Sequence, residues 1–339
     1  MLKSVVLSAS FSGLAHAAEI TVVNFGGAAG DAQKVAYIEP FEKATGTKVV
    51  MVAYNGEMGK ISAMVEANKV TWDVVELDPG EIGRACEEGL LEKIDINKIG
   101  KKNDFRPDAI HECGVGAHVW SAVLAYNADK LKTAPTGWAD FWDVKKFPGK
   151  RSMHKGAQYN LEFALMADGV PTKEVYKVLA TKAGADRAFK KLNELKPYIQ
   201  WWDAGAQPPQ FLVAGDVVMT TAYNGRIDSA QRQGKNLQIA WAGSIYNTDY
   251  WVIPKGSPNK TAAEKFIAYV TTPEAQKNFC GAIAYGPVNN NALKLLDVKT
   301  LANLPTSEKN AKNALANNPT FWADHGEELE QRFTAWAAK

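Results

Sequence analysis

Runs of valine and isoleucine alternate along this chain with segments whose apolar residues recur every three to four positions. From Glu19 the segments EITVVNF, TKVVMVAYN and WDVVELD have the composition of strands buried on both faces. Between them, DAQKVAYIEPFEKATG and GEMGKISAMVEANK have the spacing of amphipathic helices. This alternation predicts an α/β fold in which helices cover both faces of a mostly parallel sheet.

The same rhythm continues beyond the predicted strand GVGAHVWSAVLAYN. A later strand, VVMTTA, is followed by Tyr223-Asn224-Gly225, which predicts a tight turn, and then by a helix that carries Arg226. NLQIAWAG and TDYWVIPKG are predicted as two further strands. Extended crossings near Tyr126 and Tyr250 would join two α/β units, which predicts two lobes with a cleft between them.

Length and charge narrow the classes of partner. The 339 residues are enough for about two domains, each with its own core. The net charge is +2 with no basic block, which argues against nucleic acid or an anionic membrane as a partner. No apolar run approaches the roughly 20 residues of a membrane helix. The ten Trp residues favour a binding surface, because exposed Trp is costly unless something covers it.

The N-terminal residues MLKSVVLSASFSGLAHAAEI have the order of a secretory signal. One early Lys precedes a short apolar stretch, and small residues end at Ala17, which predicts a signal peptide over residues 1–17 and cleavage near Ala17. A frayed N-terminus is the alternative interpretation.

Three cysteines, Cys86, Cys113 and Cys280, fit an exported protein in which two are oxidised. A Cys86–Cys113 disulfide with Cys280 as a buried thiol is expected, and three buried thiols are the alternative. The sequence contains neither CxxC nor HExxH, so no metal site and no cofactor are predicted.

The sequence contains few motifs that are typical of catalytic or cofactor-binding sites. GGAAGD lies between a strand and a helix but does not match a dinucleotide fingerprint, so it is interpreted as a turn that could offer backbone N–H groups to a carboxylate. No GxSxG occurs and no acidic pair stands out from the solvated charges, so no catalytic residue is predicted. Binding is favoured over catalysis.

Arg226 and Asp249 are the first candidate site residues. Each lies beside a predicted strand, and strand ends gather at one edge of an α/β sheet, where ligands bind. An Arg can hold a carboxylate with two hydrogen bonds, and an Asp can hold an ammonium group. Phe25, Trp202 and Tyr223 could line the space between them. The alternative is that Arg226 and Asp249 pair with each other or with water.

Segments spread along the chain resemble one known family. WDVV, EEGLLEKID, WSAVLAYNADKL, TGWADFWDVKKFPGK, FLVAGDVVMTTAYNGR, DYWVIPKGS and AYGPVN resemble the periplasmic spermidine/putrescine-binding proteins of ABC importers. The resemblance covers nearly all of the mature chain. It implies a two-lobed type II periplasmic binding protein fold, a periplasmic location, a membrane permease as partner and no enzymatic activity. The lobes are expected at 18–127 with 251–339, and at 128–250, and the protein is expected to be a monomer.

The resemblance also implies functions for single positions. Phe25, Gly26 and Gly27 fall on the first ligand loop, Asp249 falls where polyamine binders hold an ammonium group, and aromatic residues are expected at Tyr223 and Tyr285. Two acidic residues of those relatives correspond here to Gly156 and Tyr159, and a Trp corresponds to Asn247. The full expected set is Phe25, Gly26, Gly27, Asp78, Tyr159, Trp202, Gln207, Tyr223, Arg226, Asp249 and Tyr285.

One ammonium site therefore remains, and Arg226 adds the opposite charge. This pattern resembles the γ-aminobutyrate-binding subgroup of the family and favours a short ω-amino acid as the ligand, because a dication would meet an unshielded Arg. Polyamines are the first alternative, and small organic acids held by Arg226 are the second. A secreted hydrolase or transferase would lack a nucleophile, and a ferric-ion binder would need the adjacent tyrosines that Asn224 interrupts.

Overall fold

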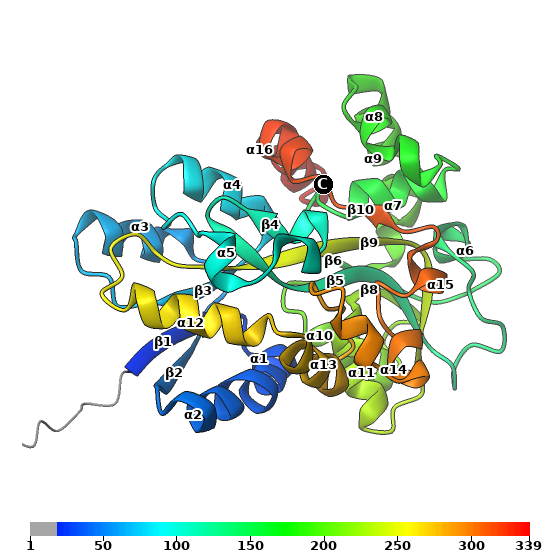
Figure 1. Cartoon of the computed structure of the whole chain (residues 1–339). Coiled ribbons are helices and arrows are strands. Elements are labelled where there is room, and N and C mark those ends of the chain that lie inside the picture. Colours follow the sequence, from blue (N-terminus) through cyan, green and yellow to red (C-terminus); the bar gives the residue numbers. More distant parts are fainter. Residues whose placement is uncertain (1–18) are drawn as a thin grey trace, which may run out of the picture.

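A computed structural model describes residues 19–339 of the chain (Figure 1). The predicted signal peptide, residues 1–17, lies outside the described residues. The strands are β1 (Glu19–Asn24), β2 (Lys48–Ala53), β3 (Val74–Leu77), β4 (Ile110–His111), β5 (Gly114–Asn127), β6 (Arg151–His154), β7 (Ile199–Trp202), β8 (Met219–Tyr223), β9 (Leu237–Val252) and β10 (Leu315–Ala316).

The α-helices vary widely in length. They are α1 (Gly27–Gln33), α2 (Glu39–Thr45), α3 (Met58–Glu66), α4 (Pro79–Glu87), α5 (Ile96–Ile99), α6 (Trp138–Trp142), α7 (Asn160–Ala167), α8 (Val175–Leu179), α9 (Lys182–Leu195), α10 (Gln207–Ala214), α11 (Asn224–Arg232), α12 (Lys260–Val270), α13 (Pro273–Ala282), α14 (Val298–Ala302), α15 (Glu308–Ala311) and α16 (Pro319–Ala337). A π-helical stretch, Lys34–Ile38, joins α1 to α2. Short 3-10 turns cover Lys102–Asp104, Pro107–Ala109, Thr172–Glu174, Lys196–Tyr198 and Ala292–Leu295.

One hydrogen-bonded sheet runs through the described residues in the order β2-β1-β3-β9-β5-β8-β6-β7. The outer pairs β1–β2, β1–β3, β6–β7 and β6–β8 are parallel, as the strand–helix alternation predicts. The central pairs β3–β9, β5–β9 and β5–β8 are antiparallel. The sheet therefore consists of two parallel α/β units joined through an antiparallel centre.

The two long strands β5 and β9 form that centre and cross the middle of the molecule in Figure 1. They pair from Gly114 opposite Val252 to Asn127 opposite Leu237, with irregular register at two points along β5. Tyr126 lies near one end of this ladder and Tyr250 near the other. NLQIAWAG and TDYWVIPKG were predicted as two strands, and this prediction was wrong because both belong to the single strand β9.

The turn predicted at Tyr223-Asn224-Gly225 is absent, because α11 begins directly at Asn224. The side chain of Asn224 explains the direct entry into a helix. Its Oδ1 accepts a hydrogen bond from the Ser121 N–H at 2.9 Å, and its Nδ2 donates to the Ala284 carbonyl at 2.5 Å. These two bonds fix the start of α11 between β5 and the loop after α13.

The glycine-rich segment after β1 also contains more helix than predicted, since α1 starts at Gly27. Gly26 has φ 60° and ψ −162°, and Gly27 has φ 55°, so both adopt backbone conformations that side chains rarely permit. The Gly26 N–H donates to Asn24 Oδ1 at 2.9 Å. The two glycines thus turn the chain sharply from β1 into α1.

The C-terminal helix α16 packs on the unit that contains β6, α7 and α9. Trp322 Nε1 donates to Glu162 at 2.9 Å, and Glu330 accepts from the Ala157 N–H at 2.7 Å. Arg332 pairs with Asp186 at 2.7 Å. The helix α16 also contacts α4, whereas α3 and α12 lie farther away, around β1–β3, in Figure 1.

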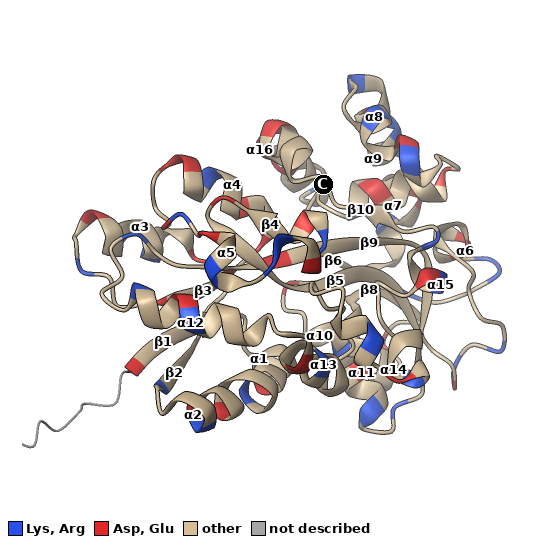
Figure 2. Cartoon of the chain, in the orientation of Figure 1, with Lys and Arg blue, Asp and Glu red and all other residues tan. Residues whose placement is uncertain are grey.

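Basic and acidic residues both occur on helices of the two units in Figure 2. Within residues 19–339, no helix combines the length and the apolar character needed to cross a bilayer.

The disulfide expected between Cys86 and Cys113 is confirmed, with the two Cα atoms 5.8 Å apart. It ties the last turn of α4 to the residue before β5. Cys280 is a buried thiol, as expected.

Thiol titration of the denatured, unreduced protein should therefore find one free group, and titration after reduction should find three. The double substitution of Cys86 and Cys113 by Ala should lower the free energy of unfolding by ~2–4 kcal/mol, because the bridge limits the unfolded chain. Urea titration measures this change. Three free thiols before reduction would rule out the disulfide.

Candidate functional site

Arg226 lies in the first turn of α11, immediately after β8, and its guanidinium group lies over the backbone of Gly27. A β-carbon on Gly27 would be 3.2 Å from Cζ and 3.3 Å from Nη2 of Arg226. Within residues 19–339 Arg226 forms no ion pair, and its buried Nε has no hydrogen-bond partner. This cation has free donors and faces the loop predicted to hold a carboxylate, which makes the two segments a suitable carboxylate site.

Asp249 lies on β9, opposite His118 of β5. Its side chain is nearly inaccessible, and its Oδ1 accepts a hydrogen bond from Trp120 Nε1 at 2.7 Å. Burial raises the pKa of Asp249 well above its ordinary value, and the nearby Asp78 and Glu76 raise it further. Asp249 does not pair with Arg226 within the described chain, so its charge is available to a cationic ligand.

Asp78 supplies a second acidic group near the same place. It follows β3 directly and is partly exposed. Removal from water raises the pKa of Asp78 to about 6, and Glu81 contributes to the increase. Burial is the main cause that raises the pKa values of Tyr159 and Tyr223. The charge of Asp78 raises both values as well, which is consistent with a position near these two rings.

Aromatic rings connect the acidic and basic ends. Tyr223, the last residue of β8, makes edge contacts with Trp120 and Trp202, with ring centroids 5.0 Å and 5.4 Å apart. Trp120 also meets Tyr159 at 6.1 Å. Four rings from β5, β7, β8 and the start of α7 thus form one aromatic cluster, called the aromatic wall below, which contains the Trp120 indole that donates to Asp249.

Tyr285 closes the site on the side of α13. Its ring stacks on His118 at 4.7 Å with an interplanar angle of 2°. Gly225 lies against the same ring, because a β-carbon there would be 2.6 Å from Cζ of Tyr285 and 2.9 Å from Ile283. The absence of a side chain at position 225 therefore allows Tyr285 to reach the site.

Tyr159 has an unusual backbone. Its φ of 69° is in the left-handed region, which costs free energy for a residue with a side chain. The strained residue precedes α7 and directs its hydroxyl to Asn247 Oδ1 at 3.4 Å. Tyr159 and Asn247, two of the three positions where the sequence departs from the polyamine-binding pattern, are therefore neighbours in space.

The remaining expected residues lie around this centre. Phe25 stacks on Tyr54 at 5.1 Å, and Trp202 is buried behind Tyr223 with its Nε1 donating to Thr221 at 3.2 Å. Gln207 Oε1 accepts from the backbone N–H groups of residues 203 and 204, so this oxygen orders its own loop. The structure brings together Asp78, Tyr159, Tyr223, Arg226, Asp249 and Tyr285, with Gly26 and Gly27 beside the guanidinium group.

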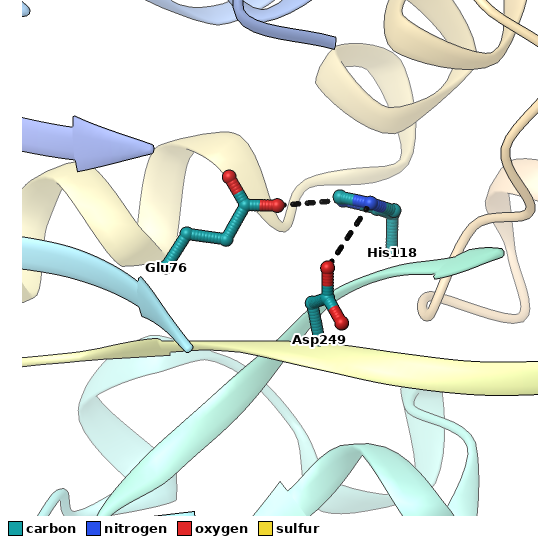
Figure 3. A group of neighbouring side chains, drawn as sticks. All are labelled: Glu76, His118 and Asp249. Atoms are coloured by element: carbon teal, nitrogen blue, oxygen red, sulfur yellow. Dashed lines mark ion pairs between the residues drawn. The ribbon is translucent and has the colours of Figure 1, made fainter. Parts of the chain in front are cut away.

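Three residues behind Asp249 were missed by the sequence analysis: Trp120, Glu76 and His118. Glu76 is 1% exposed, His118 is 2% exposed, and Figure 3 shows both grouped with Asp249. Burial raises the pKa of Glu76 to about 7 and lowers the pKa of His118 to about 3. The sequence contains a signal that could have identified Glu76 and His118. Each is an ionisable residue within an otherwise apolar strand, in VVEL and GVGAHVW.

Glu76, His118 and Asp249 have the composition of a metal site, with potential ligand atoms within 4.8 Å of one another. However, His118 presents Nδ1 to Glu76 and Nε2 to Asp249, at 3.5 Å and 3.6 Å. The lone pairs of two imidazole nitrogens point in different directions, so the carboxyl groups face different edges of the ring. One ion would have difficulty reaching both imidazole nitrogens, and the absence of a metal stays a prediction.

Comparisons with known proteins identify relatives of the whole chain. The family model described as bacterial extracellular solute-binding protein matches residues 36–306. A γ-aminobutyric acid-binding protein of Pseudomonas aeruginosa is 54% identical over 97% of this chain and 96% of its own length. A spermidine/putrescine-binding periplasmic protein of Salmonella typhimurium is 24% identical over 76% of this chain and 75% of its own length.

A solved structure described as a GABA receptor has a similar fold. It superposes with a TM-score of 0.84 at 37% identity, covering 95% of this chain and 98% of its own. Both the sequence and the fold therefore align over almost the complete described chain.

The contact between Gly225 and Tyr285 gives a direct test of the site's packing. Gly225→Ala should lower the free energy of unfolding by ~1–3 kcal/mol, because the new methyl group overlaps a buried ring. Gly83→Ala is the matched control. That helical glycine has no neighbour within 4 Å of an added β-carbon, so Ala should stabilise the protein by up to about 1 kcal/mol. Urea titration distinguishes the two, and equal effects would contradict the described packing.

Proposed function

This chain belongs to the bacterial extracellular solute-binding proteins, and we propose that its ligand is a short ω-amino acid such as γ-aminobutyrate. Its relatives are binding proteins and not enzymes, and the fold is that of the type II periplasmic binding proteins. Proteins of this kind bind small molecules and deliver them to ABC permeases. The proposed location is the periplasm, after cleavage near Ala17, and the proposed form is a monomer that does not bind nucleic acid.

The observation that carries the proposal is the separation of opposite charges in one site. Arg226, from α11, has free donors and no ion pair among the described residues. Asp249, from β9, is buried among aromatic rings, with Asp78 nearby. A zwitterion with a carboxylate at one end and an ammonium group at the other would meet a complementary charge at both ends.

The aromatic wall favours a short aliphatic spacer between those charges. The rings of Trp120, Tyr159, Tyr223 and Tyr285 offer apolar faces, and their hydroxyl and indole groups lie at the edges. A chain of methylene groups can pack on such faces without leaving a polar group unpaired. At a ceiling of ~1.5 kcal/mol per non-hydrogen atom, a ligand of about seven such atoms would bind no more tightly than roughly tens of nanomolar.

A polyamine is the alternative ligand. The acidic group Asp78 beside Asp249 favours it, because two carboxyl groups could serve two ammonium groups. The guanidinium group of Arg226 opposes it, because a second ammonium group in a closed site would lie near an uncompensated cation. The substitution experiment below separates these two ligand classes.

We also propose that two lobes close around the ligand, with the division placed at 18–127 with 251–339, and at 128–250. The contacts of α16 with Glu162, Asp186 and Ala157 support moving this helix to the second lobe. The irregular register between Ala122 and Leu124 of β5 supports a hinge within the long strands.

Substitution of the two charged residues tests the proposed ligand. Arg226→Ala and Asp249→Ala should each weaken γ-aminobutyrate binding by roughly 10²- to 10³-fold, because each leaves a buried ligand charge without its partner, a loss of ~3–5 kcal/mol. Calorimetric titration measures the affinities. Arg226→Ala should weaken putrescine binding less than γ-aminobutyrate binding, and Asp249→Ala should spare malate.

Arg187→Ala is the control for this experiment. Arg187 lies on α9 and forms an ion pair with Asp168 at the surface of the protein. It should bind γ-aminobutyrate within about threefold of the unaltered protein. If both site variants also stay within threefold, a difference of less than ~1 kcal/mol, the zwitterion proposal is wrong.

Closure is tested by small-angle X-ray scattering with and without γ-aminobutyrate. The radius of gyration should decrease at saturating ligand, because the two lobes approach each other around it. Asp249→Ala at the same ligand concentration is the control and should show no decrease. An unchanged radius for the unaltered protein at saturation would indicate a rigid body.

A further inference from the structure

The amine end of the site continues into a buried chain of ionisable groups that ligand contact alone does not explain. Asp249 is 4% exposed, and Figure 3 shows His118 between Asp249 and Glu76. His118 Nε2 lies 3.6 Å from Asp249 Oδ2, and Nδ1 lies 3.5 Å from Glu76 Oε1. The imidazole ring therefore lies between the two carboxyl groups, and its buried Nδ1 has no hydrogen-bond partner among the described residues.

The outer oxygen of each carboxyl group is held by a donor. Trp120 Nε1 donates to Asp249 Oδ1 at 2.7 Å, and Gln33 Nε2 donates to Glu76 Oε2 at 2.8 Å. Gln33 is itself oriented by Asn24, which donates to its Oε1 at 2.8 Å. The oxygen facing His118 on each carboxyl group accepts no hydrogen bond among the described residues, so it is the better placed of the two oxygens to carry or accept a proton.

The His118 imidazole ring limits which atoms of Glu76, His118 and Asp249 can carry a proton. Burial keeps the pKa of His118 near 3, so the imidazole is neutral and has one N–H group and one acceptor nitrogen. It can donate to one carboxylate, and its other nitrogen is satisfied only when the second carboxyl group is protonated. Glu76, His118 and Asp249 can therefore adopt two arrangements. In one the proton is on Asp249, and in the other it is on Glu76.

We propose that Glu76, His118 and Asp249 form a proton relay that allows Asp249 to become charged when an ammonium group binds. The relay rests on the proposed function and adds to it a means of creating charge at a buried position. Its two arrangements correspond to the site without and with an ammonium group.

Without ligand, Asp249 Oδ2 carries the proton and His118 Nδ1–H donates to ionised Glu76. On binding, the proton of Asp249 passes to Nε2, and the proton of Nδ1 passes to Glu76 Oε1. One O–H and one N–H bond break while one N–H and one O–H bond form, and no proton is exchanged with solvent. The new negative charge on Asp249 then faces the ligand's ammonium group.

The surroundings of the relay are compatible with this transfer. The pKa of Glu76 is raised to about 7, chiefly by burial and also by the charge of Asp78, while the hydrogen bond from Gln33 and the charge of Arg226 act in the opposite direction. Burial also raises the pKa values of the tyrosines whose titration is influenced by these carboxyl groups, so they stay neutral: Tyr37, Tyr54, Tyr223, Tyr250 and Tyr285. Asp78 and Arg226 are the charged side chains that act on the relay from neighbouring elements.

Glu76→Gln tests the relay because it removes the proton acceptor and keeps a side chain of the same size. Calorimetric titration with γ-aminobutyrate at pH 7.5, in buffers of different ionisation heat, counts the protons released. The unaltered protein should release less than about half a proton per ligand, because Glu76 receives the proton. Glu76→Gln should release about one, and its affinity should fall roughly tenfold for each unit that the pH is lowered from 8 to 6.

Glu66→Gln is the matched control, since Glu66 is exposed at the end of α3 and makes no contact with the site. It should release the same number of protons as the unaltered protein. Equal release from the unaltered protein and Glu76→Gln would overturn the relay, whether both release one proton or neither does.

A second measurement is made on the unaltered protein and does not depend on the folding of Glu76→Gln. Nitrogen-15 NMR of His118, assigned with His118→Asn, should show Nδ1–H in the ligand-free protein at pH 7.5 and Nε2–H with γ-aminobutyrate bound. The same tautomer in both states would overturn the relay. If the unaltered protein binds no ω-amino acid, the proposed function fails, and Nε2–H in the ligand-free protein would separately rule out the relay.

Discussion

A carboxyl group held away from water at the centre of a sheet is the constraint around which this site is arranged. Asp249 is placed there by the register of β9 against β5, which puts it opposite His118 and within reach of the Trp120 indole. Burial disfavours the charged form of this group, so the protein must supply hydrogen bonds or a counter-ion wherever the charge appears. The indole donor, the neighbouring imidazole and an ammonium ligand satisfy that requirement together.

The opposite charge comes from the other side of the fold. Arg226 is on α11, whose start is fixed by Asn224, and its guanidinium group lies over a glycine turn after β1. β5 and β9 carry the acidic end and α11 carries the basic end, and Arg226 and Asp249 form no ion pair with each other among the described residues. A protein with unpaired cationic and acidic groups at opposite ends of one site selects ligands by the distance between their own charges.

Sequence reasoning predicted the parts of this arrangement that depend on periodicity or on family resemblance. The strand–helix alternation predicted the two α/β units, and the segments shared with the family predicted Tyr223, Asp249 and Tyr285, which the structure gathers in one place. It did not predict the single long strand β9, because the glycine in AWAG looks like a strand end although the backbone continues through it. It also missed Glu76 and His118, because their importance depends on cross-strand neighbours separated by more than forty residues.

The most direct test of the central claim is a ligand series on the unaltered protein. Calorimetric titration with γ-aminobutyrate, butylamine and butyrate compares the zwitterion with molecules that keep one charge each. Charge matching at both ends predicts that butylamine and butyrate each bind at least roughly 10²-fold more weakly than γ-aminobutyrate, a loss of ~3 kcal/mol or more. If butylamine or butyrate binds within about threefold of γ-aminobutyrate, one of the two charges is not recognised and the account is contradicted.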